Sequence, residues 1–402
     1  MSKSIAVIWS EELLRYDLGG EHPMHPVRID LTMRLARSLG VLNDPGVELV
    51  SPEPATSAQI ERIHTARYAA AVRDAPIAPW GIGHGLGTDD NPIFWGMYEA
   101  SALVAGGTLQ AVQLVWRGEA DHAVSIGGGH HHAMPSSAAG FCVFNDLAIA
   151  IAWLLDNGVE RVAYVDTDVH HGDGVQAAFY DDPRVMTASI HQSPISLWPN
   201  TGFASELGRG DAVGTSINVS LPPGATNGDW FRAFEATIPA ALRQFRPQII
   251  ITQCGCDTHH EDPLADLSLT VDGHRAIYAR LRVLAEELCD GKWVATGGGG
   301  YGLVRAVPRS WTHLLAEVIG TPIDLNTPIP QVWTDQLNES VLPSFMANAV
   351  GFRTPPETMG EGASVDYVPW GGEGETALDK GILQARKAFY PLLGLDPDDS
   401  RD

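Results

Sequence analysis

Four short apolar stretches of the sequence each run directly into a segment of histidine, aspartate or glycine. AVSI precedes GGGHHH, VAYV precedes DTDVHHGDG, IIIT precedes QCGCDTHH, and WVAT precedes GGGGY. The stretches are nearly free of polar residues, as expected for strands that are buried on both faces of a parallel sheet. In open parallel sheets, ligands bind beyond the carboxyl ends of the strands, so the four ends together predict one convergent site.

Strand-like and helix-like segments alternate along most of the chain. Strands are predicted over residues 5–9, 123–126, 162–165, 185–190, 248–252 and 293–296. Helices are predicted over residues 30–39, 98–116, 146–156, 230–244 and 272–289. This alternation predicts a three-layer α/β fold, with a central, mostly parallel sheet flanked by helices.

The chain has 402 residues, which is long enough for two domains or for one large α/β domain. No linker-like composition divides the main part, so we expect one domain over residues 1–350. Residues 351–402 are expected to form a C-terminal extension, packed on or trailing from that domain. Its sequence predicts a loop rich in Gly, Pro and Glu over 353–375 and a helix over 376–393.

The net charge of −23 bears on the partners of the protein. Such a charge repels nucleic acid and anionic lipid and is compatible with cationic substrates such as lysine-bearing peptides or polyamines, although acidity for solubility alone is the commoner explanation. No stretch approaches the ~20 apolar residues of a membrane span, and no signal peptide is expected. The four cysteines form no CxxC pair, which predicts a reducing, cytoplasmic compartment. The oligomeric state is left open.

The segment DTDVHHGDG suggests a metal site. If the chain stays extended beyond the strand, Asp166, Asp168 and His170 fall on one side, and the last two can reach one cation. The best candidate for a third ligand is Asp257, which follows another apolar strand. Carboxylate and imidazole suit Zn²⁺ and other first-row metals such as iron, and three protein ligands leave a position for water. The alternative, in which these residues only cap turns and pack, is disfavoured by the four strand ends together.

Other polar residues at the strand ends supply the remaining chemistry. Histidine suits a base near neutral pH, and a carboxylate on its other nitrogen holds one tautomer. Asp166 and Asp173 could do this, which predicts two His–Asp pairs beside one metal. Tyr301 is expected to donate to an oxyanion, with a merely packed tyrosine as the alternative. A phosphate-binding role for glycines 297–300 is disfavoured because neither GK[ST] nor GxGxxG accompanies them.

Longer motifs around these residues resemble a known family. GGGHHHAMPSSAAGFCVFND, YVDTDVHHGDG, CGCDTHHEDPLADLSLT and GGGGY occur in the order seen in the zinc-dependent histone deacetylase superfamily, and the resemblance covers about residues 5–320. HPMHPVRIDLT and GTDDNP resemble its bacterial acetoin-utilization (AcuC) branch. The resemblance implies the arginase/deacetylase fold, one Zn²⁺ per chain, and removal of acetyl groups from protein lysine side chains. It also suggests acetyl-CoA synthetase as a substrate.

The resemblance implies a role for each residue at a matching position. The implied zinc ligands are Asp168, His170 and Asp257. The implied catalytic residues are His131 with Asp166 behind it, His132 with Asp173 behind it, and Tyr301. The implied substrate-binding residues are Asp90, Gly140, Phe141, Trp198 and Leu264. An implied potassium site would use Asp166, Asp168 and His170 with Ser189 and Ile190.

The triplet of histidines divides into a pair and a neighbour. Because His131 and His132 are adjacent, they can face one site only from an irregular turn, and not from a strand or helix. His130 has no implied role and is expected to line the cavity wall. Trp198 stands where many family members have Phe, which leaves the acyl-chain preference open.

Three other functions compete with lysine deacetylation. An acetylpolyamine amidohydrolase would share the reaction but act on small cationic substrates. A binuclear ureohydrolase of the same fold would need extra Asp and His ligands for a second metal. A non-catalytic reader of acyl-lysine is disfavoured by the full set of ligands, bases and tyrosine.

Overall fold

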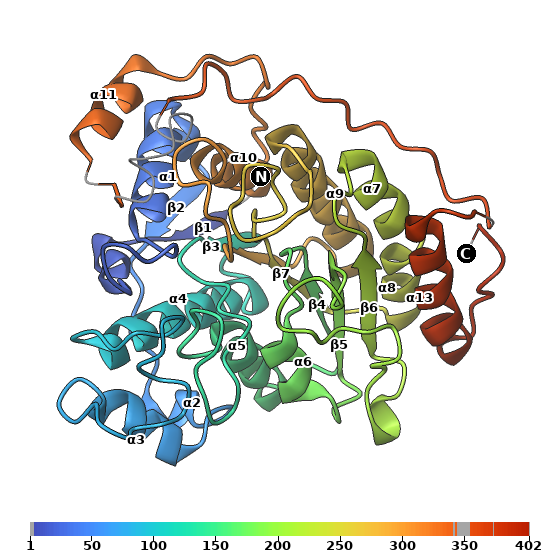
Figure 1. Ribbon diagram of the computed structural model, residues 1–402, viewed down its shortest axis with the longest axis horizontal. Coiled ribbons are helices and arrows are strands. Elements are labelled where there is room, and N and C mark those ends of the chain that lie inside the picture. Colours follow the sequence, from blue (N-terminus) through green and yellow to red (C-terminus); the bar gives the residue numbers. More distant parts are fainter. Residues whose placement is uncertain (1–3, 341, 344–353, 373, 402) are drawn as a thin grey trace.

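The computed structural model describes residues 4–340, 342–343, 354–372 and 374–401, and its centre is one sheet of parallel strands (Figure 1). The strand order is β2-β1-β3-β8-β7-β4-β5-β6. The strands are β1 Ile5–Ile8, β2 Val47–Val50, β3 His122–Ser125, β4 Val162–Asp166, β5 Val185–Gln192, β6 Ser216–Leu221, β7 Ile249–Gln253 and β8 Trp293–Thr296. The four strands that end in the polar motifs, β3, β8, β7 and β4, are consecutive neighbours, so their carboxyl ends meet at one edge.

Helices cover both faces of the sheet, which gives the predicted three-layer α/β architecture. The α4, α5 and α6 helices lie on one face, and α1, α10, α9, α8 and α7 lie on the other (Figure 1). The helices are α1 Val27–Ser38, α2 Ser57–Ile60, α3 Ala66–Asp74, α4 Met97–Trp116, α5 Asp146–Asp156, α6 Asp173–Phe179, α7 Asn227–Glu235, α8 Ile238–Phe245, α9 Val271–Cys289, α10 Val307–Ile319, α11 Gln331–Glu339 and α13 Ala377–Leu393. Short 3-10 helices are η1 Glu11–Arg15, η2 Val41–Asn43 and η3 Gly210–Ala212.

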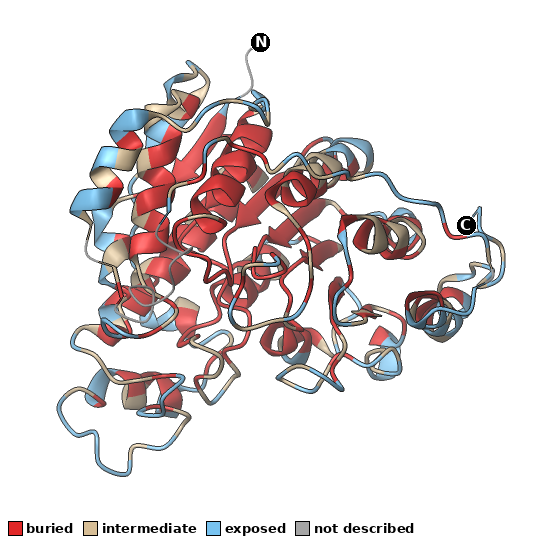
Figure 2. Ribbon diagram, turned by 45° about the horizontal axis from the view of Figure 1, so that its top comes forward, coloured by how far each residue is buried: buried red, intermediate tan, exposed pale blue. Residues whose placement is uncertain are grey.

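Successive residues of the central strands point into two different apolar cores. In β4, Ala163 and Val165 pack in the core under α9 and α10, whereas Val162 and Tyr164 pack in the core under α4 and α5. This alternation follows from the two-residue repeat of a strand. The interior strands are therefore buried throughout, as Figure 2 shows. None of the described helices has both the length and the apolar character needed to cross a membrane.

All six predicted strands are present at nearly the predicted bounds, but β2 and β6 were missed. These two strands form the edges of the sheet. β2 exposes Glu48 and Leu49, and β6 (SINVSL) alternates polar with apolar residues. A search for continuous apolar runs finds strands buried on both faces and overlooks edge strands for this reason.

One predicted helix is wrong, because the segment 230–244 forms two helices. α7 ends at Glu235 and α8 begins at Ile238, with Thr237 between them at φ −135° and ψ −68°. Pro239 lies in the first turn of α8. In one continuous helix this proline would lack an N–H donor and would clash with the preceding turn, so a new helix starts there instead.

The C-terminal segment crosses the helical layer and returns to the sheet edge. In Figure 1 its described part, which resumes at residue 354, passes α10, α9 and α7 and reaches α13. α13 packs on β6, and its Ile382 and Phe389 belong to the same apolar core as the sheet. The predicted C-terminal helix is thus confirmed. The division into 1–350 and 351–402 stays a prediction, because that boundary lies outside the described residues.

The packing of α13 can be tested with Phe389→Ala. Phe389 is fully buried, so the truncation should lower the free energy of unfolding by about 3–5 kcal/mol. Urea unfolding followed by circular dichroism measures this change, and Lys387→Ala on the exposed side of α13 is the matched control. A loss below about 1 kcal/mol, or a separate early transition confined to the helix, would contradict docking of α13 on the main core.

Candidate active site

Three donor groups converge where β4 and β7 end side by side. Asp168 and His170 follow β4, and Asp257 follows β7, its parallel neighbour. His170 Nδ1 lies 3.2 Å from Asp168 Oδ1 and 3.2 Å from Asp257 Oδ2. Both aspartates are fully buried. The structure therefore brings together the three residues predicted as metal ligands.

The two carboxylates are held by groups that leave one oxygen of each facing the site. Asp168 Oδ2 accepts hydrogen bonds from the Gln253 amide at 2.7 Å and from the Gly299 N–H at 2.8 Å. Asp257 Oδ1 accepts the Val169 N–H at 2.9 Å. The remaining oxygens point to His170.

This donor set fits Zn²⁺. Ligand bonds of about 2.0–2.1 Å in a tetrahedron place neighbouring donor atoms roughly 3.3 Å apart, close to the two distances of 3.2 Å found here. Hydrogen-bonded carboxylates of this kind orient the ligands of a metal site. The three residues would hold one ion and leave room for a further ligand.

Two histidine–aspartate pairs lie beside the donor set. His131 Nδ1 is 2.7 Å from Asp166, and His132 Nδ1 is 2.7 Å from Asp173. The imidazole ring centres are 4.0 Å apart. Residues 127–132 form an irregular turn rather than a strand or helix, as the adjacency of the two histidines requires.

The environments of the two histidines drive their pKa values apart. Burial lowers the pKa of His131, but Asp166 and Asp168 outweigh it and raise the pKa to about 9. Burial, together with the charge of His131, lowers the pKa of His132 well below its usual value. Burial also raises the pKa of Asp173 to about 6, so that carboxylate is ionised at neutral pH. The arrangement places a cationic imidazole beside a neutral one.

The histidine turn is fixed by the start of α5, which the sequence did not reveal. Asp146 accepts the N–H groups of Gly129 at 2.9 Å and His130 at 2.7 Å, and Asn145 donates to the carbonyl oxygen of His131 at 3.3 Å. His130 lines the same cavity as the pair, as predicted, with its ring 4.6 Å from that of Tyr16.

Tyr301 closes the cavity from the end of β8. Its N–H donates to Asp262 at 2.7 Å. Arg28 holds the glycine loop before it, donating to the carbonyl oxygens of Gly298 at 2.8 Å and Gly300 at 3.2 Å. Burial raises the pKa of Tyr301 well above its usual value, so the side chain stays a neutral phenol and a hydrogen-bond donor.

Aromatic rings flank the site on two sides. Phe141 meets Tyr301 edge-on at 5.7 Å, and Trp198 meets His132 edge-on at 4.6 Å. Trp198 is 42% exposed, so this wall reaches the surface. A Cβ on Gly140 would lie 2.5 Å from His132 and 2.6 Å from Trp198, which explains a glycine at this position.

The other two predicted substrate-binding residues, Asp90 and Leu264, neighbour groups that contact the site. Asp90 is exposed and neighbours His22, whose ring meets Phe141 edge-on at 4.5 Å; burial lowers the pKa of His22, and Asp90 opposes that shift. Leu264 is half-buried and its N–H donates to Asp262 at 3.0 Å.

The residues of the predicted potassium site are neighbours across two strands. Ser189 is the register partner of Asp166 in the β4–β5 pair, and Ile190 follows it. The Ser189 hydroxyl hydrogen-bonds His191 at 2.8 Å. The potassium site stays a prediction.

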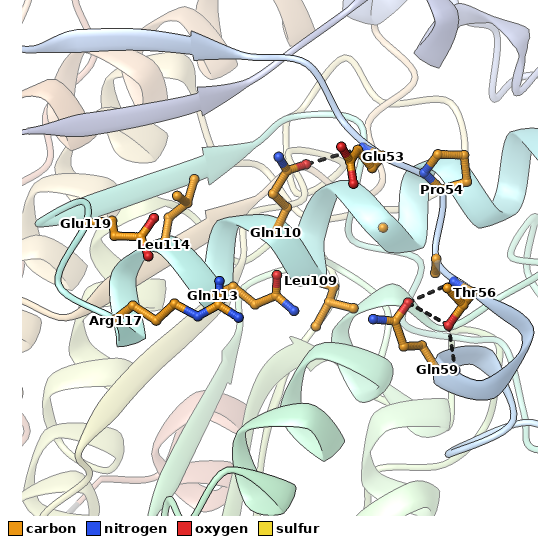
Figure 3. Close-up of a pocket in the computed structure, with 12 residues that line it drawn as sticks. Glu53, Pro54, Thr56, Gln59, Leu109, Gln110, Gln113, Leu114, Arg117 and Glu119 are labelled. Atoms are coloured by element: carbon orange, nitrogen blue, oxygen red, sulfur yellow. Dashed lines mark hydrogen bonds between the residues drawn. The ribbon is translucent and has the colours of Figure 1, made fainter.

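A separate cleft runs along α4 (Figure 3). None of the predicted site residues lines it. Gln110 of α4 accepts the Glu53 N–H from the loop after β2 at 3.3 Å, and Gln59 accepts the Thr56 N–H at 2.8 Å within the N-terminal cap of α2. Gln110 and Gln59 therefore have structural partners in this cleft.

Several residues that build the site were missed by the sequence reasoning, namely Arg28, Asp146, Gln253 and Asp262. Two signals were available. Asp262 lies in the same motif as Asp257, and Gln253 is a polar residue at the end of a buried apolar strand. The residue type alone does not indicate the partner. Gln253 contacts Asp168 and Asp262 contacts Tyr301, and in each case the two residues are far apart in the sequence.

Comparisons with known proteins agree with the fold and with the geometry of the site. Residues 22–318 match the histone deacetylase domain family. The chain therefore belongs to the histone deacetylase family of hydrolases. A crystal structure of a histone deacetylase homologue from Aquifex aeolicus superposes with a TM-score of 0.82 at 28% identity, covering 96% of this chain and 100% of that one.

Within the family, the chain is similar to the bacterial AcuC proteins. It is 40% identical over 330 residues to the acetoin utilization protein AcuC of Bacillus subtilis (strain 168), covering 81% of this chain and 84% of the relative. It is 33% identical over 353 residues to AcuC of Staphylococcus aureus (strain MRSA252), covering 83% and 90%. The predicted membership of this branch is confirmed.

Gly299→Ala tests the donor set. A Cβ at Gly299 would lie 1.9 Å from Asp257 Oδ2, the oxygen that faces the site. We expect the substitution to displace Asp257 and to weaken Zn²⁺ binding about 10–100-fold, measured by competition with a chromogenic chelator. Gly371→Ala, where a Cβ meets no atom within 4 Å, is the control. Unchanged Zn²⁺ affinity in Gly299→Ala would contradict the placement of Asp257.

Proposed function

We propose that this protein is a zinc-dependent deacetylase that removes acetyl groups from lysine side chains of proteins. The observation that supports it is one buried cavity whose lining includes Asp168, His170, Tyr301 and the two adjacent histidines. Asp257 lies 3.2 Å from His170, and Asp166 and Asp173 pair with the two histidines from behind. This combination suits amide hydrolysis, because it offers a metal position, a base and an oxyanion donor.

The zinc ion, held by Asp168, His170 and Asp257, would polarise the acetyl carbonyl and lower the pKa of the attacking water. His132 is the base: its Nδ1–H donates to Asp173, so its Nε2 is free to accept the proton of that water. The water oxygen bonds to the acetyl carbon. His132 then returns the proton to the lysine nitrogen as the carbon–nitrogen bond breaks, giving acetate and lysine.

The other two polar groups stabilise charge. His131, kept cationic by Asp166, contributes positive charge rather than proton transfer. Tyr301, kept protonated by burial, donates to the oxygen on which negative charge develops. Phe141 and Trp198 would line the path of the acyl-lysine side chain, and Asp90 would hold the substrate backbone at the rim.

The native substrate is proposed from the family relationship. Similarity to AcuC proteins supports an acetylated metabolic enzyme, with acetyl-CoA synthetase as the candidate, in the cytoplasm. A potassium ion beneath the zinc, near Asp166 and Ser189, belongs to the same proposal.

A binuclear ureohydrolase is disfavoured by the partners of the spare histidine and aspartate. His171 uses Nδ1 for Thr201 at 2.8 Å and Nε2 for Gln176 at 3.0 Å. Asp166 receives the hydroxyl of Tyr164 at 2.5 Å in addition to His131. Within the described ranges, these groups are engaged and do not offer a second set of ligands.

The proposal is tested with purified protein on a panel of acetyl-lysine peptides, acetylated acetyl-CoA synthetase, acetylcadaverine and acetylspermine. We expect zinc-dependent release of acetate from the peptides and protein, loss of activity with a chelator, and recovery on adding Zn²⁺. His132→Ala is the inactive control. Activity on the polyamines alone would favour the amidohydrolase, and two manganese ions per chain would favour the ureohydrolase.

Tyr301→Phe tests the role of the Tyr301 hydroxyl, because it removes that group and keeps the ring. Loss of one oxyanion donor is expected to lower kcat by about 10²–10³-fold, because the interaction forms mainly in the transition state. Steady-state kinetics on the best peptide measures the change, and retained Zn²⁺ affinity shows that the site is intact. Turnover equal to that of the unsubstituted protein would refute the role of Tyr301.

A further inference from the structure

A single short turn joins the third metal-ligand candidate to the anchor of the tyrosine. Asp257 begins the turn, and Asp262 ends it by donating its N–H to the carbonyl oxygen of His259 at 2.8 Å. The Asp262 carboxylate in turn accepts the Tyr301 N–H at 2.7 Å. Any displacement of this turn would therefore move a ligand of the metal and the oxyanion donor together.

The turn is held from outside by Glu361 of the C-terminal segment. His259 Nδ1 accepts the N–H of Glu261 at 3.1 Å, so its proton is on Nε2, which donates to Glu361 Oε1 at 3.1 Å. The Glu361 carboxylate also accepts the N–H of Val271, at the start of α9, at 3.3 Å. One carboxylate thus ties the turn to a helix of the main domain.

Arg309 of α10 fixes the carboxylate in place. Its guanidinium donates to Glu361 at 2.5 Å and to the carbonyl oxygen of Gly360 at 3.1 Å. His259 and Arg309 are almost completely buried, and the Glu361 side chain is 15% exposed. Buried charged pairs of this kind are strongly oriented, because leaving one partner unpaired is costly.

We call the contact of Glu361 with His259 and Arg309 the clasp. Its hydrogen bonds do not suit a second metal site. His259, His260 and Glu361 offer ligand atoms within 4.8 Å of one another. However, the Glu361 oxygens face a guanidinium and two N–H donors, and His259 presents a proton rather than a lone pair. A cation would have to displace all three.

We propose that Glu361 is a positioning residue of the active site, through which the C-terminal segment clasps the turn 257–262 and so sets both Asp257 and Tyr301. The residue lies beyond position 318, where the match to the family domain ends. Only the part of this inference that concerns turnover rests on the proposed function, since ligand placement can be measured without a substrate.

Glu361→Ala in the full chain tests the clasp. We expect Zn²⁺ affinity, measured by chelator competition, to fall about tenfold, as for other residues that orient metal ligands. We also expect kcat for an acetyl-lysine peptide to fall while KM changes less than about twofold, because Tyr301 acts mainly in the transition state.

Asp379→Ala is the matched control. Asp379 also belongs to the C-terminal segment and forms a largely buried ion pair, with Arg232 at 2.6 Å. Arg232 lies in α7, so this pair does not contact the active-site turn. It should lower Tm as Glu361→Ala does, with Zn²⁺ affinity and kcat unchanged.

Equal losses of Tm with unchanged Zn²⁺ affinity and kcat in both variants would overturn the clasp. If Glu361→Ala does not fold, Glu361→Gln, which keeps the size and one acceptor oxygen, should show smaller shifts in the same direction, and wild-type values there would overturn the proposal. Weakened Zn²⁺ binding in a protein that deacetylates none of the substrates would support the clasp and refute the proposed function.

Discussion

The structure depends on the pairing of buried carboxylates at the ends of parallel strands. A charge in this interior is tolerated only when every oxygen has a partner. Asp166, Asp168 and Asp257 meet this requirement in the same way, because each places one oxygen on a backbone N–H and turns the other toward a histidine. The same hydrogen bonds therefore stabilise the ends of the strands and orient the carboxylate oxygens that could bind a cation.

The same constraint explains the glycines that surround the carboxylates. A Cβ at Gly255 would lie 2.1 Å from Asp168, one at Gly172 would lie 2.2 Å from Asp166, and one at Gly299 would lie 1.9 Å from Asp257. These loops pass so close to the charged oxygens that a side chain is excluded. The glycine-rich ends of the strands thus serve close packing against the site.

The site is also supported from segments far away in the chain. Asp146 at the start of α5 holds the histidine turn, and Arg28 of α1 holds the glycines before Tyr301. Glu361, which lies beyond the main run of strands and helices, holds the turn after β7 through His259. Asp146, Arg28 and Glu361 are charged side chains on a helix or on the C-terminal segment. Each fixes a loop with irregular backbone in one geometry.

The interior strands, their ends and the polar residues that gather there can all be predicted from the sequence. Those features follow from local rules, since apolar runs mark buried strands and parallel strands end together. The resemblance paired His131 with Asp166 and His132 with Asp173, and the distances agree. The edge strands β2 and β6, the break before α8, and the contacts of Asp146 and Glu361 become evident only in the folded chain. An edge strand lacks the continuous apolar run that marks a buried strand. The residues around a carboxylate in the sequence do not indicate its partner, because the two segments meet only once the chain has folded.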